Sequence, residues 1–208
     1  MNTKYSQRHR VHAIGRQVRE WIQFVGRDFR APSPTFIKMR TLTSFAIPNG
    51  VWVETGTYMG GTSLYLAKRY PKVISIEPSD DYFAYSSSRL RKLGNVTLMH
   101  GTSEDLFEDA LASSAPFANI WLDGHFSEGG TFEGKQVTPV MDELSSVAKL
   151  KSEFQEIVIF IDDIRLFPKS NFDDDTGYPY FTLVTKWCEE NGFKWELQND
   201  ILVARLIN

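Results

Sequence analysis

Four side chains suited to catalysis follow two apolar segments in the second half of the chain: Asp123, His125, Asp162 and Asp163. Carboxylate oxygens are the ligands that Mg²⁺ prefers, with Mn²⁺ or Ca²⁺ as alternatives, so the three aspartates are candidate metal ligands. A metal bound there could lower the pKa of a substrate hydroxyl group. His125 is a candidate general base, because its ordinary pKa is about 6.5. The alternative is that these carboxylates only end strands and cap turns.

The elements that must position these side chains are strands of a parallel sheet. Residues 118–122 precede Asp123, and residues 157–161 precede Asp162. Both segments are apolar almost throughout, which is typical of central strands buried on two faces. Open α/β sheets bind ligands beyond the carboxyl ends of their strands. We therefore expect the four side chains to meet at one edge of the sheet.

A glycine-rich turn predicts a cofactor site at the same edge. The apolar residues 51–53 lead into Glu54, Gly56, Gly60 and Gly61, and helix-forming sequence follows. Glycine reaches backbone angles closed to other residues and lets the main chain approach a ligand closely. A dinucleotide site has the spacing Gly-x-Gly-x-x-Gly, whereas here an acid precedes the first glycine by two residues, which favours a cationic cofactor. A turn without any ligand is the alternative.

Glu77 ends the next apolar run, about 20 residues after Gly56, where an acid can accept both ribose hydroxyls. With these residues the sequence resembles the class I S-adenosylmethionine-dependent methyltransferases. The resemblance implies that Glu54 and the glycine loop contact the methionine part of the cofactor, that Glu77 holds the ribose, and that Ser103 lies near the adenine. It also places Asp123 beside the cofactor. The loop candidates are Gly56, Thr57, Tyr58, Gly60, Gly61 and Thr62.

Other motifs resemble narrower groups. The acids after residues 122 and 161 look like those of metal-dependent O-methyltransferases of the catechol and macrocin types, which implies Mg²⁺ held by the three aspartates. Residues 121–127, Thr138-Pro139 with Glu143-Leu144, and residues 161–167 are similar to methyltransferase-like proteins of bacterial surface-polysaccharide and glycan gene clusters. The sequence departs from the macrocin type at His125, where a second acid is usual. Phe126 stands where related enzymes carry a basic catalytic side chain.

These resemblances imply methyl transfer to a hydroxyl of a sugar or another small polar acceptor, with a divalent metal. Arg165 could clamp a phosphate or carboxylate of the acceptor, or it could pair structurally with Asp162 or Asp163. Phe126 and Tyr178 are candidate stacking surfaces for a sugar ring, with packing as the alternative. Two other functions stay open: a metal-independent methyltransferase that uses His125 as base, and a non-catalytic adenosyl-cofactor-binding module in glycan assembly.

Length and patterning predict one α/β domain. The chain has 208 residues, 42% hydrophobic and 24% charged, which suits one globular core and leaves no room for two full domains. Strand and helix patterns alternate, and the turn at residues 198–200 predicts an antiparallel hairpin. The resemblance implies a Rossmann-like methyltransferase fold, with a mostly parallel seven-stranded sheet, a C-terminal antiparallel hairpin and helices on both faces. We expect the cofactor-binding domain at residues 47–208 and a basic helical N-terminal extension at residues 1–46.

Positive charge is concentrated at the N-terminus. Residues 1–40 hold nine Lys or Arg against two acids, although the net charge of the chain is −3. Val11, Ile14, Val18, Trp21, Ile22 and Val25 recur at helical spacing. This stripe favours docking on the acidic body or a homodimer through the helix, with an anionic membrane or nucleic acid as alternatives. The acidic body argues against nucleic acid. We find no transmembrane or signal segment and expect a cytoplasmic protein.

Overall fold

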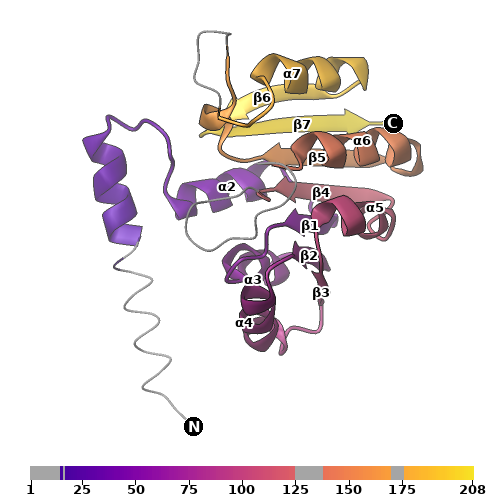
Figure 1. Ribbon diagram of the computed structural model, residues 1–208, viewed down its shortest axis with the longest axis horizontal. Coiled ribbons are helices and arrows are strands. Elements are labelled where there is room, and N and C mark those ends of the chain that lie inside the picture. Colours follow the sequence, from indigo (N-terminus) through magenta and orange to yellow (C-terminus); the bar gives the residue numbers. More distant parts are fainter. Residues whose placement is uncertain (1–14, 16, 125–137, 170–175) are drawn as a thin grey trace.

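The computed structural model describes residues 15, 17–124, 138–169 and 176–208. Its centre is a seven-stranded sheet with the order β3-β2-β1-β4-β5-β7-β6 (Figure 1). The strands are β1 Val51–Thr55, β2 Val73–Glu77, β3 Val96–His100, β4 Phe117–Leu122, β5 Glu156–Ile161, β6 Lys194–Gln198 and β7 Ile201–Ile207. Strands β1 to β5 are parallel, and β7 runs antiparallel to both of its neighbours. The predicted fold class is confirmed.

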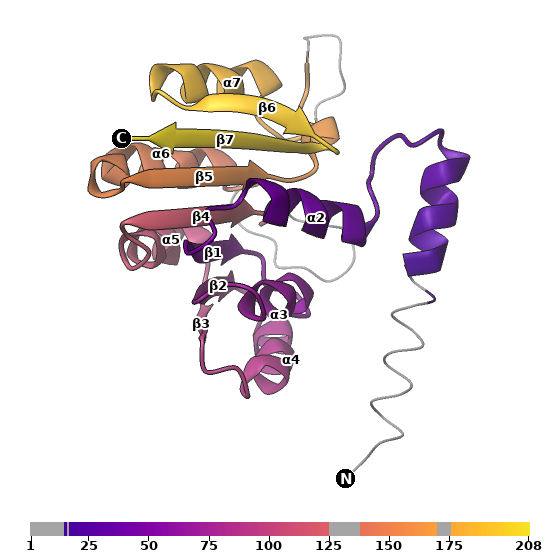
Figure 2. The same ribbon diagram turned by 180° about the vertical axis from the view of Figure 1, so that it is seen from behind.

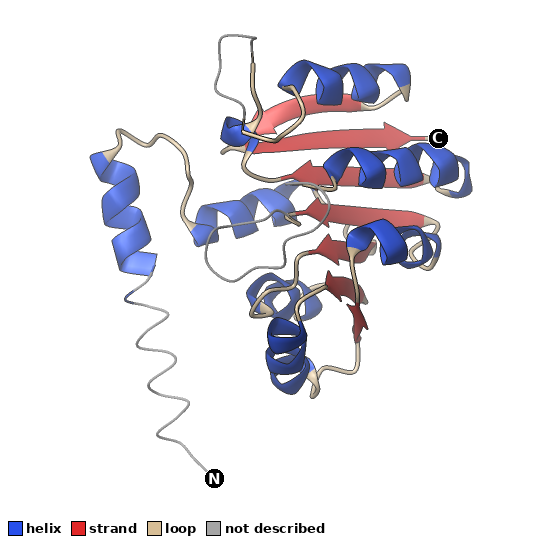
Figure 3. Ribbon diagram, in the orientation of Figure 1, coloured by secondary structure: helices blue, strands red, loops and turns tan. Residues whose placement is uncertain are grey.

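Helices cover both faces of the sheet. They are α2 Thr35–Phe45, α3 Gly61–Ala67, α4 Asp80–Leu90, α5 Ser103–Ala112, α6 Val140–Leu150 and α7 Phe181–Glu190. Helices α5, α6 and α7 lie in front of the sheet in Figure 1, and α2 lies in front of it in the reverse view of Figure 2. The sheet therefore lies between two sets of helices, and Figure 3 marks its strands in red and the helices in blue.

Two hydrophobic cores follow from the alternation of side chains along the strands. In β5, Ile157, Ile159 and Ile161 belong to the core shared with α5, α6 and α7. Their neighbours Val158 and Phe160 belong to the core shared with α2 and α3. The strand is therefore buried on both faces, which explains why its sequence is apolar without interruption.

The C-terminal hairpin joins β6 to β7 through Asn199 and Asp200. Both turn residues have positive φ, 53° and 72°, as the two central residues of a type I′ hairpin turn require. Asparagine and aspartate tolerate this conformation better than other side chains do. The predicted hairpin is confirmed, and its turn lies at the carboxyl end of β5.

Asn119 in β4 anchors the turn between α2 and β1. The side chain is fully buried; its Oδ1 accepts from the Ile47 N–H at 2.8 Å, and its Nδ2 donates to the Ile47 carbonyl at 3.0 Å. A Cβ on Gly50 would lie 2.5 Å from this Nδ2, so glycine leaves room for the amide. The contact fixes the end of α2 against the sheet.

Replacing Asn119 with alanine is expected to lower the free energy of unfolding by about 2–4 kcal/mol, because it leaves the buried N–H of Ile47 without a partner and removes one of the two hydrogen bonds that the Ile47 carbonyl accepts, the other coming from the Gly50 N–H. Urea denaturation of the purified protein would measure the loss. Asn49→Ala, at an exposed turn position two residues from Ile47, is the matched control and should change stability by less than about 0.5 kcal/mol. Equal losses in both variants would contradict the anchoring role.

A helix over residues 17–26 precedes α2 and stands apart from the sheet (Figure 1). Glu20 ties it to the start of α2, since its carboxylate accepts from the Thr35 N–H at 2.9 Å and from the Thr35 hydroxyl at 3.2 Å. Phe24 is its buried apolar residue, whereas Val18, Trp21, Ile22 and Val25 of the predicted stripe are exposed. Val11 and Ile14 lie outside the described residues. The homodimer stays a prediction.

Among the helices that the structure describes, none has both the length and the apolar character needed to cross a membrane.

Candidate active site

The glycine loop after β1 touches the end of β4 through its backbone. Gly56 has a φ of +82°, and a Cβ there would lie 2.8 Å from the carbonyl oxygen of Asp123. Gly60, with a φ of +68°, precedes α3, and a Cβ on Gly61 would meet nothing within 4 Å. The loop therefore needs glycine at position 56 for close contact and leaves open space beside position 61.

Glu54 is buried at the end of β1. Its Oε2 accepts hydrogen bonds from the hydroxyls of Ser63 and Ser75, the latter at 2.7 Å. Its buried Oε1 has no hydrogen-bond partner among the residues that the structure describes. Burial raises the pKa of Glu54 to about 7, although the two hydroxyls oppose the shift. A buried carboxylate oxygen with spare accepting capacity fits a cationic cofactor.

Glu77, at the end of β2, faces the same loop. Its Oε2 accepts from the Tyr58 N–H at 2.6 Å, and its Oε1 accepts from the Ser79 N–H at 2.9 Å. Each carboxylate oxygen can accept a second hydrogen bond, so ribose hydroxyls fit the remaining positions. The neighbouring loop residue Thr57 turns inward, and its hydroxyl lies 2.6 Å from that of Ser75.

Ser103 begins α5 and lies near a buried acid that the functional prediction from sequence did not include. This acid is Glu143 of α6, and the residue is only 2% exposed. Burial raises the pKa of Glu143 to about 8, while interactions with Ser103 and Thr55 oppose the shift. The sequence carries a signal for it, because Glu143 falls at helical spacing among the core residues Val140 and Val147.

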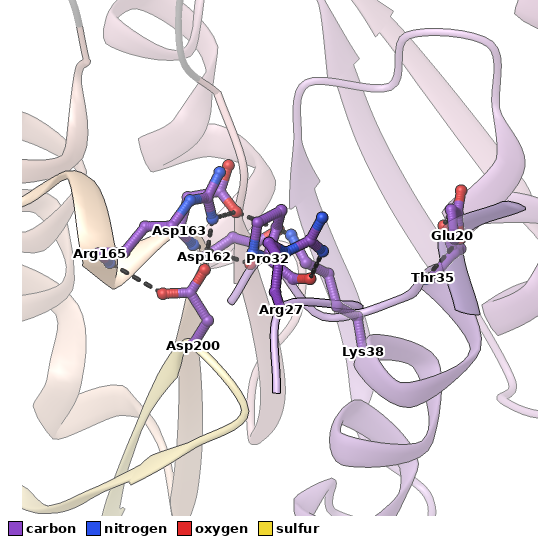
Figure 4. Close-up of polar contacts among 9 residues, drawn as sticks. All are labelled: Glu20, Arg27, Pro32, Thr35, Lys38, Asp162, Asp163, Arg165 and Asp200. Carbon is purple, nitrogen blue, oxygen red and sulfur yellow. Dashed lines mark hydrogen bonds and ion pairs between the residues drawn. The ribbon is translucent and has the colours of Figure 1, made fainter. Parts of the chain in front are cut away.

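The acid pair after β5 is bridged by a lysine that the sequence analysis did not single out. Asp163 has a positive φ of 52°, which turns the chain directly after Asp162. Lys38 of α2 places its Nζ 2.6 Å from Oδ2 of Asp162 and 2.8 Å from Oδ1 of Asp163 (Figure 4). Acidic neighbours raise the pKa of Lys38 above its usual value, against the opposing effect of burial.

Arg165 ties the acid pair to the C-terminal hairpin. Its Nη1 lies 2.6 Å from Oδ1 of Asp163 and also contacts Oδ2 of Asp200, while its backbone N–H donates to Oδ1 of Asp200 at 2.8 Å. Burial opposes ionisation of Asp163, but Arg165 and Lys38 lower its pKa to about 2. These contacts match the structural alternative for Arg165.

The predicted metal ligands Asp123, Asp162 and Asp163 lie at one edge of the sheet, and the ammonium group of Lys38 lies between two of them. The Lys38 ammonium occupies the position between Asp162 and Asp163 where a cation would bind. Within the described ranges, no group of three or more acidic, histidine or cysteine side chains is placed to hold a metal. His125 and Phe126 lie outside the described residues.

A cavity of about 310 Å³ opens beside this cluster. Lys38, Thr62 and Asp123 line it from the side of the sheet, and Glu20 and Arg27 line it from the N-terminal helix and the turn that follows. The cavity thus lies between Thr62, in the first turn of α3, and Asp162 of the acid pair. Tyr178 lines a second, smaller space that also contacts Asp123 and Asp162, and its ring packs against Phe167 at 5.1 Å between centroids.

Comparison with solved structures finds the same fold in methyltransferases. A candidate rRNA methylase from Clostridium thermocellum has a TM-score of 0.57 and 12% identity, over 82% of this chain and 94% of that one. The O-methyltransferase TomG from Streptomyces achromogenes, solved with S-adenosylmethionine, has a TM-score of 0.53 and 18% identity, over 83% and 78%. A candidate methyltransferase from Streptococcus mutans, solved with S-adenosylhomocysteine, has a TM-score of 0.53 and 12% identity, over 85% and 99%.

No protein-family model matches the sequence, and comparison with curated proteins finds no significant relative. The structural likeness nevertheless extends over more than four fifths of the chain. The protein therefore has the class I S-adenosylmethionine-dependent methyltransferase fold, as its motifs predicted.

Proposed function

We propose that the protein is an S-adenosylmethionine-dependent methyltransferase that methylates a hydroxyl of a sugar or another small polar acceptor. The observation that carries this proposal is that the glycine loop meets Glu77 of β2 through the Tyr58 N–H and Asp123 after β4 through Gly56, while Asp123 itself lines the 310 Å³ cavity. Neighbours with this fold that were solved with S-adenosylmethionine or S-adenosylhomocysteine support the cofactor.

Bound S-adenosylmethionine would supply the methyl group: the new C–O bond forms as the S–C bond breaks, and the hydroxyl proton leaves to a base. Glu77 and the loop from Gly56 to Thr62 would hold the cofactor. The buried carboxylate of Glu54 would favour its positive charge. Holding both reactants in line contributes roughly 7–11 kcal/mol to lowering the barrier. His125, two residues after Asp123, is the predicted base.

The sequence predicted two forms of this reaction, one with Mg²⁺ and one without metal. The contacts of Lys38 with Asp162 and Asp163 favour the second form, because the ammonium already supplies the positive charge that two adjacent carboxylates need. A metal-independent transfer with His125 as base is therefore the form that we propose.

The lining of the cavity supports a small polar acceptor. Its volume is at the lower end of the usual range for ligand pockets, roughly 300–1,000 Å³, and most of its lining residues are polar or charged. The O-methyltransferase activity named for TomG is consistent with a hydroxyl acceptor. A role in polysaccharide biosynthesis rests on the sequence resemblance and is part of this proposal, and the cytoplasmic location expected from the sequence stays a prediction.

Calorimetric titration with S-adenosylhomocysteine tests the cofactor assignment. The wild-type protein should bind, and Glu77→Ala should bind at least about 10-fold more weakly, because it loses charge-assisted hydrogen bonds to the ribose. Glu153→Ala, at an exposed position after α6, is the matched control and should bind like the wild type. Absence of binding to the wild type would contradict the proposal. Binding without turnover on diverse hydroxyl acceptors would instead favour the non-catalytic module.

A further inference from the structure

Lys38 connects the N-terminal part of the chain to the acid pair after β5 (Figure 4). Its Nζ lies within 2.8 Å of an oxygen of both Asp162 and Asp163, and these are the lengths of charge-assisted hydrogen bonds. One ammonium group therefore bridges two carboxylates that follow each other in sequence. Asp163 has a second cation in Arg165, whereas in the described part of the chain Asp162 forms its ion pair with Lys38.

The surroundings hold this ammonium in place. The Lys38 side chain is 17% exposed, and the Asp162 side chain is 3% exposed. Lys38 belongs to α2, whose residues Met39 and Leu42 are part of the hydrophobic core. Moving the ammonium away would leave Asp162 without its counterion, so the carboxyl, whose pKa burial already raises, would either stay as an unpaired buried charge or take up a proton, and both are unfavourable.

A divalent ion would need the same carboxylate oxygens. Mg²⁺ binds oxygen ligands at about 2.0–2.1 Å, so an ion on Asp162 and Asp163 would lie against the Lys38 ammonium and be repelled by it. The ion could bind only if Lys38 left its position. The acid pair is thus already neutralised by residues of the chain itself.

We propose that Lys38 is a built-in cation that takes the place of a divalent metal: it neutralises Asp162 and Asp163, fixes their position beside the cavity and excludes metal from them. Lys38 is then a positioning residue. Two consequences follow. Removing the ammonium opens the acid pair to a divalent ion, and, if the proposed function holds, methyl transfer by the wild type is unaffected by a chelator.

Binding of Mn²⁺, followed by the electron paramagnetic resonance signal of the free ion, tests the first consequence. The full-length wild type is expected to bind Mn²⁺ only weakly. Lys38→Met should bind the ion at least about 10-fold more tightly than the wild type does, because the repulsion by the ammonium is gone. Lys38→Met/Asp162→Asn is the matched control, because it removes one charge of each sign. This double variant should not show the tighter Mn²⁺ binding that is expected for Lys38→Met.

Thermal melting supplies a second measurement that does not depend on activity. Lys38→Met leaves buried carboxylates without their cation and should melt roughly 10 °C below the wild type. Mn²⁺ should restore much of this loss, while the double variant should melt close to the wild type without metal. Lys38→Gln, which keeps a hydrogen-bond donor but no charge, serves if the methionine variant does not fold.

Two results would overturn the proposal. One is tight Mn²⁺ binding by the wild type that Lys38→Met does not improve, and the other is no Mn²⁺ binding by either uncharged Lys38 variant. Titration of the same samples with S-adenosylhomocysteine keeps the two proposals separate. Binding of that ligand tests the methyltransferase function, and its outcome does not depend on whether Mn²⁺ binds.

Discussion

Gly56→Ala is expected to reduce the affinity for S-adenosylhomocysteine by roughly 10- to 100-fold, since backbone strain at such a position costs about 1–3 kcal/mol and about 1.4 kcal/mol is tenfold in affinity. The new Cβ would lie 2.8 Å from the carbonyl oxygen of Asp123, a contact between two backbone segments that no side-chain rotation can relieve. The φ of +82° adds strain, since side chains rarely adopt it. The glycine loop and the end of β4 must therefore separate, which moves the residues proposed to hold the cofactor.

Gly94→Ala is the matched control for this substitution. Gly94 lies in the exposed turn before β3, and a Cβ there would meet nothing within 4 Å. Calorimetry should find wild-type affinity in this variant, and circular dichroism should show both proteins folded. If Gly56→Ala binds as well as Gly94→Ala does, the contact between the glycine loop and β4 does not shape the cofactor site.

The fold could be predicted from sequence because its signals are local. The unbroken apolar run of β5 marks a strand buried on both faces, and the two positive φ angles at Asn199 and Asp200 follow from residue types that favour a hairpin turn. The N-terminal helix shows the limit of such signals. Its apolar stripe predicted a face that packs against the body or a second subunit. In the structure the helix is attached through Glu20 and Phe24, and most of the stripe is exposed. Helical spacing alone does not say which neighbour a helix packs against.

The candidate site could be predicted only as far as the sheet determines it. Glu54 and Glu77 are among the last two residues of β1 and β2, and Asp123 and Asp162 directly follow β4 and β5, so their position at one edge follows from the parallel topology. Lys38 reaches Asp162 from a helix 124 residues away in sequence, and nothing in its local sequence marks that contact. The metal prediction rested on the acids alone, without the cation that neutralises them.

Glu143→Gln is expected to reduce, without abolishing, a decline in stability that the wild type should show as the pH rises. The buried carboxyl of Glu143 has its pKa raised from 4.5 to about 8. Between these pH values the folded protein keeps a proton that the unfolded chain has released, so rising pH favours unfolding. The full shift corresponds to about 3–5 kcal/mol, lost progressively across this window. Glutamine has nearly the same shape and carries no charge at any pH.

Urea denaturation at about pH 5 and about pH 9 measures this effect, since the two values bracket the window. The variant and the wild type should be similar at the lower pH, and the variant should be more stable at the higher one. Glu153→Gln, at an exposed position, should keep the wild-type dependence. The same decline in Glu143→Gln would mean that Glu54 or Asp162, whose pKa values are also raised, carries it instead.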